Sequence, residues 1–284
     1  MKTIVHLSDL HFGRTDPELV AALVADVGEA GPDLGVVSGD LTQRARDREF
    51  RAARAFLDAL PGPRLVVPGN HDVPLYNPVA RLLFGLRGYR RHIAGDVAPF
   101  HRDDECAVLG VNTARSLAIK SGRISPGQLR AVGRALRGLP PGLTKVLVTH
   151  HPFDLPPRSH HDKVVGGARR AIEALAELGV DVVLSGHAHQ AHAGHSATRF
   201  RAAHRALLFV QAGTATSTRV RGEPNSWNVV RLDGGGVRVE RRAWSDAERR
   251  FVAVDVQHFR RASSGWSSEV LAPPALAGAS SAAS

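Results

Sequence analysis

Short apolar runs rich in β-branched residues recur along the chain, and each of them ends in a cluster of polar residues. Five such runs with their clusters occupy residues 3–11, 34–40, 64–72, 145–151 and 181–189. Continuous apolar runs of this length are typical of strands that are buried on both faces, as in a sheet covered by helices. The pattern therefore predicts five strands, each followed at its carboxyl end by polar side chains.

Stretches with apolar residues at helical spacing lie between these runs. We predict helices over residues 17–30, 47–60, 125–136 and 168–178. The first has Asp16 as its N-cap and Pro17 at its first helical position. Strands that alternate with helices predict an α/β sheet, in which ligands gather at the carboxyl ends of the strands. We therefore expect all five polar clusters at one edge of a sheet.

The last third of the chain is richer in strand-like segments. Residues 206–211, 227–232 and 237–243 are candidate strands, the last two joined by a turn at 233–236, and we expect a second sheet packed against the first. From about residue 263 the chain consists mainly of Ser, Ala, Gly and Pro, which is typical of a flexible tail. The sequence thus predicts one domain over residues 1–262 and a tail over residues 263–284.

A basic and apolar insertion follows the third cluster directly, over about residues 73–92. We favour an amphipathic helix that covers the sheet. The alternative is a lid, or a surface that meets a lipid or nucleotide substrate.

Composition adds a prediction about partners and location. The net charge of +10 favours an anionic partner such as a phosphate ester, nucleic acid or a membrane surface, although scattered arginines also arise from codon bias. The single cysteine, Cys106, excludes an intrachain disulfide and favours a cytoplasmic location. We expect no transmembrane segment, because no apolar run approaches the ~18 residues that cross a bilayer, and no signal peptide is visible.

Pooled together, the five clusters supply two aspartates, one asparagine and several histidines, and they contain no cysteine. Oxygen and imidazole ligands without a thiolate suit Mn, Fe, Zn or Co better than Ca or a structural zinc ion. These candidates are too many for one ion, so we predict two divalent or trivalent metal ions. A carboxylate shared by both would hold them ~3.5–4 Å apart.

The order of these residues resembles a known signature. Asp9-x-His11, Gly39-Asp40, Gly69-Asn70-His71-Asp72, His150 and Gly186-His187-x-His189 are similar, in this order, to the motifs of the calcineurin-like metallophosphoesterase superfamily. The resemblance spans residues 1 to about 190, and it looks closest to the bacterial branch with the class III cyclic-nucleotide phosphodiesterases. It implies an α/β fold, a four-layer α/β/β/α sandwich of two mixed β-sheets flanked by helices.

The resemblance also implies a role for each matching residue. Three ligands are implied for the first ion, three for the second and one that bridges them: Asp9, His11 and His189; Asn70, His150 and His187; and Asp40. His71 is implied to face the substrate phosphate and assist the leaving group without binding metal. The family pattern favours His150 over His151 as a ligand, and no organic cofactor is implied.

These roles fit a simple hydrolytic mechanism. Two metal ions lower the pKa of a bridging water enough to supply hydroxide near neutral pH. We expect this hydroxide to attack phosphorus in line, while His71 donates a proton or hydrogen bond to the departing alkoxide. Asp72 either orients His71 or a metal-binding histidine, or only caps the following turn.

The residues that select the ester are harder to identify. Five candidates to clamp phosphate lie on predicted loops near the site, although each alone is better explained as a surface or structural residue: Arg14, Arg44, Arg115, Arg123 and Asn112. Four further histidines are too irregularly spaced to be given a role: His160, His161, His192 and His195.

Three functions compete at this point. We favour hydrolysis of cyclic nucleotides or other small phosphodiesters, because the ligand set is complete and no accessory domain is visible. The insertion motivates a nucleotide-lipid pyrophosphohydrolase of the UDP-diacylglucosamine type as the alternative. A basic nucleic-acid-binding protein is the third, but the basic residues form no single stripe, so we expect no stable nucleic-acid partner. Peripheral membrane contact and the oligomeric state are left open.

Overall fold

Two sheets form the centre of the molecule in the computed structural model, which describes residues 1–74, 78–116, 118, 120–155, 164–195, 206–218, 222–262 and 265–271. The seven-stranded sheet contains, in spatial order, β13 (Gly265–Leu271), β12 (Arg250–Ala262), β11 (Gly236–Ser245), β10 (Ser226–Leu232), β1 (Lys2–Leu7), β2 (Leu34–Val37) and β3 (Arg64–Val66). The six-stranded sheet contains β4 (Phe100–Arg102), β5 (Cys106–Gly110), β6 (Thr144–Val148), β7 (Val182–Ser185), β9 (Leu208–Gln211) and β8 (His192–His195).

Both sheets mix parallel and antiparallel pairs. In the first sheet β1, β2 and β3 are parallel, whereas β10 pairs with β1 in the antiparallel sense. In the second sheet β5, β6, β7 and β9 are parallel, and the edge strands β4 and β8 are antiparallel to their neighbours. The parallel strands of each sheet therefore end at the same edge.

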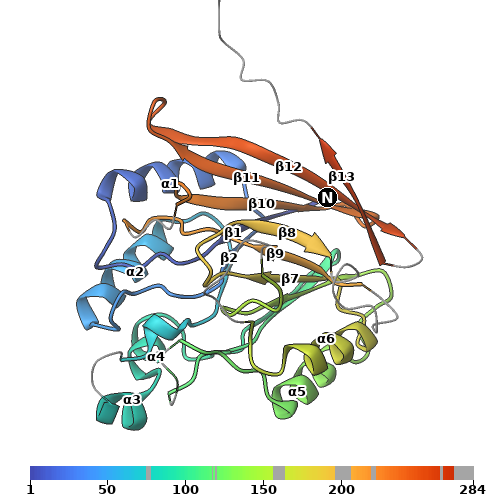
Figure 1. The fold of residues 1–284 in the computed structure, drawn as a ribbon, viewed down its shortest axis with the longest axis horizontal. Coiled ribbons are helices and arrows are strands. Elements are labelled where there is room, and N and C mark those ends of the chain that lie inside the picture. Colours follow the sequence, from blue (N-terminus) through green and yellow to red (C-terminus); the bar gives the residue numbers. More distant parts are fainter. Residues whose placement is uncertain are drawn as a thin grey trace, which may run out of the picture.

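Helices cover the outer face of each sheet (Figure 1). The helices are α1 (Pro17–Ala30), α2 (Asp47–Ala59), α3 (Pro78–Phe84), α4 (Arg87–His92), α5 (Pro126–Leu136), α6 (Ala168–Glu177) and a single 3₁₀ turn, η1 (Asn70–Asp72). Side chains of α1, α2 and α4 pack on the seven-stranded sheet, and those of α5 and α6 pack on the six-stranded sheet. The layers therefore follow the order helix, sheet, sheet, helix.

The core is divided between the layers by the alternation of side chains along each strand. In β1, Val5 belongs to the cluster under the helices, whereas Ile4 belongs to the cluster between the two sheets. In β6, Val148 packs between the sheets, and Leu147 packs against α5 and α6. Successive residues of a strand point to opposite faces, so fully apolar strands are buried on both sides. The predicted four-layer fold class is confirmed.

Local signals place the helix ends. The Asp16 side chain accepts a hydrogen bond from the backbone N–H of Glu18 at 2.9 Å, which caps α1 as predicted. The helix predicted to run to residue 60 ends at Ala59, because Leu60 precedes Pro61 and is extended. The last predicted helix ends near Gly179, which has a positive φ of 73°.

The expectation that all five cluster-bearing strands share one sheet is wrong. β1, β2 and β3 belong to the seven-stranded sheet, whereas β6 and β7 belong to the six-stranded sheet. The candidate strands near the end of the chain are divided as well, since β9 joins the second sheet and β10 and β11 extend the first. An apolar pattern shows that a strand is buried on both faces, but it does not show which strand is its neighbour.

Part of the segment expected to be a tail is a strand. Gly265–Leu271 form β13, which pairs with β12 in the antiparallel sense. Trp266 is buried there and packs into the cluster between the sheets. The Ser-rich composition predicted a flexible segment, although one buried aromatic residue, Trp266, packs this strand onto the core. Residues 272–284 lie outside the described part of the chain.

The insertion contains two short helices where one amphipathic helix was predicted. α4 covers the sheet, since Tyr89 is fully buried and its hydroxyl donates to the Val66 carbonyl at 2.8 Å. α3 instead exposes most of its described apolar side chains. The two helices are separated at Gly85, whose positive φ of 43° ends α3.

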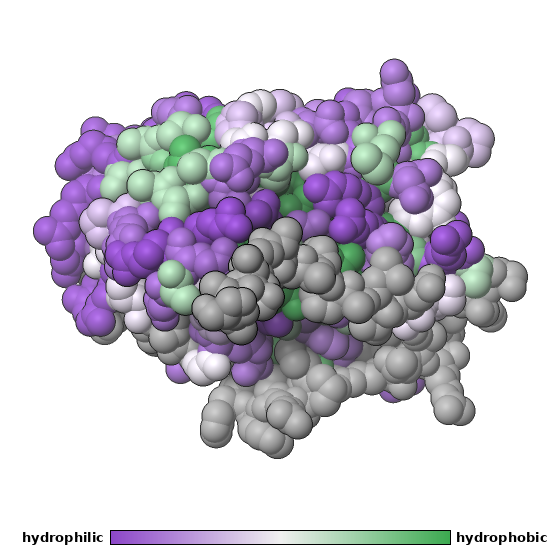
Figure 2. Space-filling view, turned by 90° about the horizontal axis from the view of Figure 1, so that it is seen from above, coloured by the Kyte–Doolittle hydropathy of each residue, from purple (hydrophilic) through white to green (hydrophobic). Residues whose placement is uncertain are grey.

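The face at the top of Figure 1 is shown in Figure 2, and most of its coloured atoms belong to hydrophilic residues. Within the described ranges, none of the helices combines the length and the apolar character that crossing a membrane requires.

Candidate metal centre

The polar clusters meet where the parallel strands of the two sheets end. The seven predicted ligands and His71 lie in the loops that follow β1, β2, β3, β6 and β7. Six of the predicted ligands have buried side chains: Asp9, His11, Asp40, Asn70, His150 and His189. His71 and His187 are partly exposed. The centre therefore combines side chains from both sheets.

The backbone is strained at most of these positions. Five of the seven predicted ligands adopt the left-handed conformation: Asp9 (φ 53°), His11 (51°), Asp40 (54°), His187 (72°) and His189 (58°). Non-glycine residues rarely adopt this conformation, and such strain concentrates at functional sites. Only two other described non-glycine residues have a positive φ, Ala45 and Arg249. The strain is therefore a property of this centre.

Glycine precedes three of the ligands because the backbone approaches other parts of the centre closely. Gly39 has a φ of 100°, and a Cβ atom there would lie 2.7 Å from His150 Nδ1. A Cβ atom at Gly186 would overlap the Ser8 hydroxyl and come within 2.6 Å of Asp9 Oδ2. Any larger residue would displace a ligand.

The first group of predicted ligands consists of Asp9, His11 and His189. The Nε2 atom of His189 lies 3.2 Å from Asp9 Oδ1, and that of His11 lies 3.6 Å from the same oxygen. The other carboxylate oxygen, Asp9 Oδ2, accepts hydrogen bonds from the Ser8 hydroxyl at 2.7 Å and the His187 N–H at 2.8 Å. Asp9 is thus held through one oxygen, and its other oxygen faces the two histidines.

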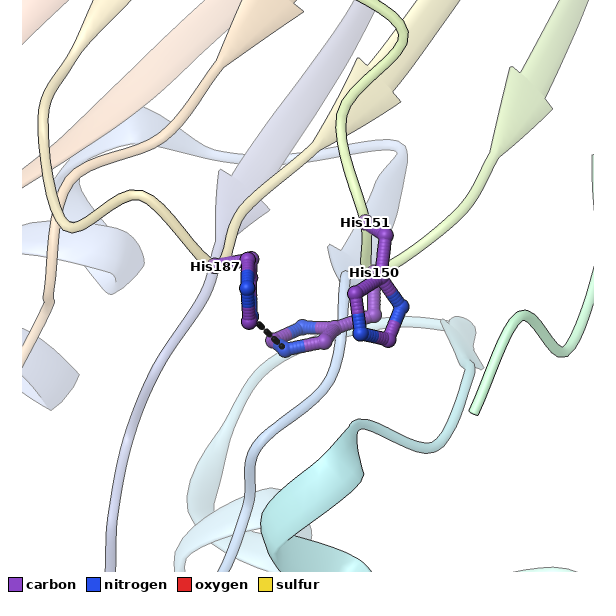
Figure 3. Close-up of side chains that lie close together, drawn as sticks. All are labelled: His150, His151 and His187. Carbon is purple, nitrogen blue, oxygen red and sulfur yellow. Dashed lines mark hydrogen bonds between the residues drawn. The ribbon is translucent and has the colours of Figure 1, made fainter. Parts of the chain in front are cut away.

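The second group consists of Asn70, His150 and His187. His150 Nδ1 donates to the Ser38 carbonyl at 2.9 Å, which leaves its Nε2 atom facing Asn70 Oδ1 at 3.1 Å. The same Nε2 atom lies 3.2 Å from His187 Nδ1, a contact drawn as a dashed line in Figure 3. A backbone carbonyl that fixes the ring and its tautomer is typical of a metal-binding histidine.

Asp40 lies between the two groups. Its Oδ2 atom is 3.8 Å from His11 Nε2 and 3.3 Å from His150 Nε2. Its Oδ1 atom accepts the backbone N–H of His71 at 2.8 Å. One carboxylate oxygen therefore faces a nitrogen from each group, as a bridging ligand requires.

Electrostatics at the centre favours ionised carboxylates. Burial opposes charge on Asp9 and Asp40, but His189 beside Asp9 and His150 beside Asp40 lower the pKa of each carboxyl well below its usual range. Burial also opposes charge on His150, yet Asp40 raises the pKa of this imidazole to about 9. For His11 burial dominates and lowers the pKa. Two buried negative charges thus attract cations to this point.

The residues fit a site for metal ions. Ligand atoms of Asp9, His11 and His189 lie within 4.8 Å of one another, as do those of Asp9, Asp40 and His150. Among the described residues the fully buried Asp9 Oδ1 accepts no hydrogen bond, and its near neighbours are the Nε2 atoms of His189 at 3.2 Å and His11 at 3.6 Å. A buried carboxylate oxygen that accepts no hydrogen bond is costly unless a cation binds it.

His71 is held differently from the ligands. Its Nδ1 atom donates to the Gln43 carbonyl at 2.8 Å, because a carbonyl can only accept. This leaves Nε2 as the nitrogen available to other groups. The ring lies edge-on to His11, with 4.8 Å between the ring centroids.

His151 has hydrogen-bond partners for both ring nitrogens. Nδ1 pairs with the Thr113 hydroxyl at 2.8 Å, and Nε2 donates to the Lys120 carbonyl at 3.0 Å. Burial lowers the pKa of His151 well below its usual range. The ring lies beside those of His150 and His187 in Figure 3. Ring nitrogens of His150, His151 and His187 lie within 4.8 Å of one another, so the choice of His150 as the ligand stays a prediction.

Asp72 holds a loop and does not orient a histidine side chain. Its carboxylate accepts the backbone N–H groups of Leu41, Thr42 and Gly69 at 2.9 to 3.2 Å. Burial and the nearby charge of Asp40 raise the pKa of Asp72 to about 6. These contacts differ from both predicted roles, because the carboxylate binds segments that precede Asp72 in the chain and not the turn that follows it.

The candidate phosphate clamps are not gathered into one group by the structure. Arg14, Arg44 and Arg123 are exposed, and the Asn112 side chain accepts the Ala114 N–H at 2.9 Å within its own loop. Arg115 contributes its carbonyl to Arg81. His192 is partly buried in β8, whereas His160, His161 and the side chain of His195 lie outside the described residues.

The motifs alone missed several supporting groups. Ser8 holds Asp9, and Thr113 holds His151. The Thr214 hydroxyl donates to the Asp9 carbonyl at 2.8 Å from a distant part of the chain. The position of Ser8 next to Asp9 could have indicated its role, whereas no sequence signal points to Thr113 or Thr214.

Comparison with known proteins agrees with this geometry. Residues 2–191 match the family described as calcineurin-like phosphoesterases. The chain belongs to this family of metallophosphoesterases, and it carries the family's buried cluster of histidine and aspartate residues.

Two relatives are similar to parts of the chain. A glycerophosphodiester phosphodiesterase from Enterobacter lignolyticus is 36% identical over 80 residues, which is 24% of this chain and 29% of that protein. A probable cyclic nucleotide phosphodiesterase from Synechococcus is 27% identical over 203 residues, 66% of this chain and 74% of that protein. The first match thus spans less than a third of the relative's length.

Solved structures share the fold. A purple acid phosphatase from yellow lupin seeds superimposes with a TM-score of 0.67 and 10% identity, covering 89% of this chain and 52% of that chain. A dimetal phosphatase from Danio rerio gives a TM-score of 0.61 at 13% identity, covering 89% of this chain and 98% of that chain. At such low identity the likeness concerns the fold alone.

Proposed function

We propose that this protein hydrolyses small phosphodiesters, cyclic nucleotides among them, by in-line attack of hydroxide on phosphorus at a centre that holds two metal ions. The observation that carries the proposal is the position of Asp40, whose Oδ2 atom faces His11 on one side and His150 on the other. Both relatives described above are phosphodiesterases by name, which supports a diester substrate.

The proposal gives each group of residues a task. Asp9, His11 and His189 would hold one ion, Asn70, His150 and His187 the other, and Asp40 both, with Mn, Fe, Zn or Co as the ions that suit these donors. Such ions supply hydroxide near neutral pH, because they lower the pKa of bound water. Two aspartates offset only part of their charge, so an anionic phosphate is attracted to the centre.

His71 would act on the leaving group. The Gln43 carbonyl holds its Nδ1–H, which leaves Nε2 for other groups, and a ring nitrogen of His71 lies within 4.8 Å of ligand atoms of His11 and Asp40. In its imidazolium form, which carries a proton on both ring nitrogens, His71 would donate a hydrogen bond or a proton from Nε2 to the departing alkoxide and keep its Nδ1–H on Gln43. The partial exposure of His71 leaves it accessible to substrate, whereas all the predicted ligands except His187 are buried.

A substrate panel tests the proposal. Metal-loaded protein should be offered bis-p-nitrophenyl phosphate, p-nitrophenyl phosphate, cyclic AMP and a UDP-diacylglucosamine analogue. We expect the diester to be hydrolysed faster than the monoester. Asp40→Ala should lower kcat/KM by at least about 10³-fold, or about 4 kcal/mol of transition-state stabilisation. Asp104→Ala, which removes an exposed carboxylate far from the motif, is the matched control.

His71→Ala separates catalysis from metal binding in the same assay. It should lower kcat about 10²–10⁴-fold, while the metal content measured by mass spectrometry stays at two ions per chain. Loss of metal from this variant would show that His71 is a ligand. Full activity of Asp40→Ala would overturn the two-metal proposal.

One observation favours a second candidate function, a nucleotide-lipid pyrophosphohydrolase. α3 exposes apolar side chains on loops that follow the metal-binding strands, as an enzyme for a lipid-linked substrate would require. Preference for the UDP-diacylglucosamine analogue in the panel would select this alternative.

We also propose that β1 to β13 form one domain and that the protein acts in the cytoplasm without a stable nucleic-acid partner.

A further inference from the structure

The helix α3 carries a concentrated apolar surface. Its members are Val79, Leu82, Leu83 and Phe84, with exposed fractions of 65%, 63%, 68% and 49%, and we call them the α3 patch. Val79, Leu82 and Leu83 are spaced three and four residues apart, so they share one face of the helix. The other exposed large hydrophobic residues of the described chain occur singly: Met1, Phe100, Val164 and Val254.

A buried arginine fixes the orientation of this helix. Arg81 is only 5% exposed, and its guanidinium donates to the carbonyls of Ser116 at 2.7 Å, Arg115 at 3.0 Å and Pro74 at 3.1 Å. It also contacts the Ala118 carbonyl. If α3 rotated to bury the patch, these carbonyls would lose their donor and the charged Arg81 guanidinium would lose its acceptors. The patch is therefore held outward by a specific anchor on the loops that follow β3 and β5.

A basic rim adjoins the patch. Arg87, Arg90 and Arg91 of α4 are exposed, and the Arg87 guanidinium lies 5.4 Å from the centre of the Phe84 ring. Asp47, an acidic residue near α4, is already paired with Arg51 and His92. Arg90 also donates from Nη1 to the Gly95 carbonyl at 2.9 Å, and all three side chains remain exposed and can meet an external anion.

We propose that the α3 patch and its arginine rim dock on the surface of an anionic phospholipid bilayer. Apolar side chains would enter the interface while the arginines contact lipid phosphates, the combination by which peripheral proteins bind such membranes. The charge of the rim argues against a second copy of the chain as the occupant. A symmetric dimer through this face would bring the same arginines of both chains together. The proposal does not depend on which phosphodiester is hydrolysed.

Vesicle sedimentation with the full chain tests the docking. Vesicles with about one third phosphatidylglycerol should bind the protein, pure phosphatidylcholine vesicles should bind it weakly, and added salt should weaken binding to the anionic vesicles. The double variant Leu82→Ser, Leu83→Ser should lower partitioning to anionic vesicles at least about tenfold, because two apolar side chains no longer enter the interface. Val254→Ser, which removes one exposed apolar side chain from β12, should bind as the unaltered chain does.

A second pair of variants tests the rim. Arg87→Gln, Arg90→Gln should weaken binding to anionic vesicles about tenfold, since each arginine near the surface contributes to the attraction. Arg134→Gln, Arg137→Gln removes the same charge from α5 and should have little effect. The circular dichroism spectrum and Tm of each variant should match those of the unaltered chain, which shows that each is folded whether or not the proposed activity is correct.

Three outcomes would overturn the proposal. One is that anionic vesicles fail to bind the protein. Another is that the α5 pair weakens binding as much as the rim pair, which would indicate a general effect of the net charge of +10. The third is that the unaltered chain is a dimer by sedimentation velocity and the leucine variant is a monomer, which would assign the patch to self-association.

Discussion

The adjacent histidines His150 and His151 face different surroundings, because each ring is oriented by its own hydrogen bonds. His150 donates through Nδ1 to the Ser38 carbonyl and turns Nε2 toward Asp40. His151 has both nitrogens engaged, and its ring centroid lies 4.9 Å from that of His150 and 4.5 Å from that of His187. His151 thus supports two candidate ligands of one group and none of the other.

This asymmetry predicts a selective effect on metal binding. His151→Ala should weaken the second metal ion about 10–100-fold, the usual cost of losing a residue that positions ligands. Affinity for the first ion should stay unchanged, because no contact joins His151 to Asp9, His11 or His189 among those observed. Calorimetric titration of the metal-free protein with Mn²⁺ would resolve the two affinities.

Thr113→Val gives a milder version of the same experiment, since it removes the hydroxyl that holds His151 Nδ1 and keeps the side-chain shape. His101→Ala, a half-buried histidine paired with Asp103, is the control. Equal weakening of both ions would mean that His151 only contributes to general stability.

At the scale of elements, the sequence predicts what local signals determine. Asp16 caps α1 as its type and position indicated, whereas Ser125, predicted as the first residue of its helix, is the N-cap of α5. The gathering of carboxylate, amide and imidazole groups at strand ends was predictable as well, and the assignment of these groups as metal ligands stays a prediction. Strand pairing was not readable, because β6 and β7 are as apolar as β1 and β2 although they belong to another sheet.

The geometry of the strand-end loops was also beyond prediction. Left-handed conformations at Asp9 and His187 and carbonyl acceptors at Ser38 and Gln43 belong to the backbone, which carries no residue-specific signal. Glycine is the one partial exception. Gly39 precedes Asp40 both because its φ is 100° and because His150 occupies the place of a side chain.

Alanine should have opposite effects on stability at Gly39, in the loop after β2, and at Gly28, in α1. Gly39→Ala should destabilise the fold by about 2 kcal/mol or more, from left-handed strain of about 1–2 kcal/mol plus the overlap with His150. Gly28→Ala in α1 meets no atom within 4 Å and should stabilise by about 0.5–1 kcal/mol. Urea unfolding of both variants would measure these changes, and unaltered stability of Gly39→Ala would contradict the close packing of this loop.

At the scale of the whole molecule, the centre joins the two sheets. Asp9 and His11 follow a strand of the seven-stranded sheet, whereas His189 follows a strand of the six-stranded sheet. The second group is divided in the same way, with Asn70 from one sheet and His150 from the other. Ions bound by these residues would cross-link the layers, in addition to the apolar cluster that packs between them.

Metal removal should therefore lower the stability of the entire fold. Without cations the buried carboxylates of Asp9 and Asp40 repel each other across the centre, and Asp9 Oδ1 has no donor. Metal at about 100 times its Kd should add about 2.7 kcal/mol, or a rise in Tm of roughly 5–10 °C for a chain of this size. Scanning calorimetry with and without a chelator would measure the shift, and Asp40→Ala should show much less of it. If the chelator lowered the Tm of Asp40→Ala by the same amount, the stabilising ions would bind elsewhere. Loss of the shared ligand should remove most of the cross-link between the sheets.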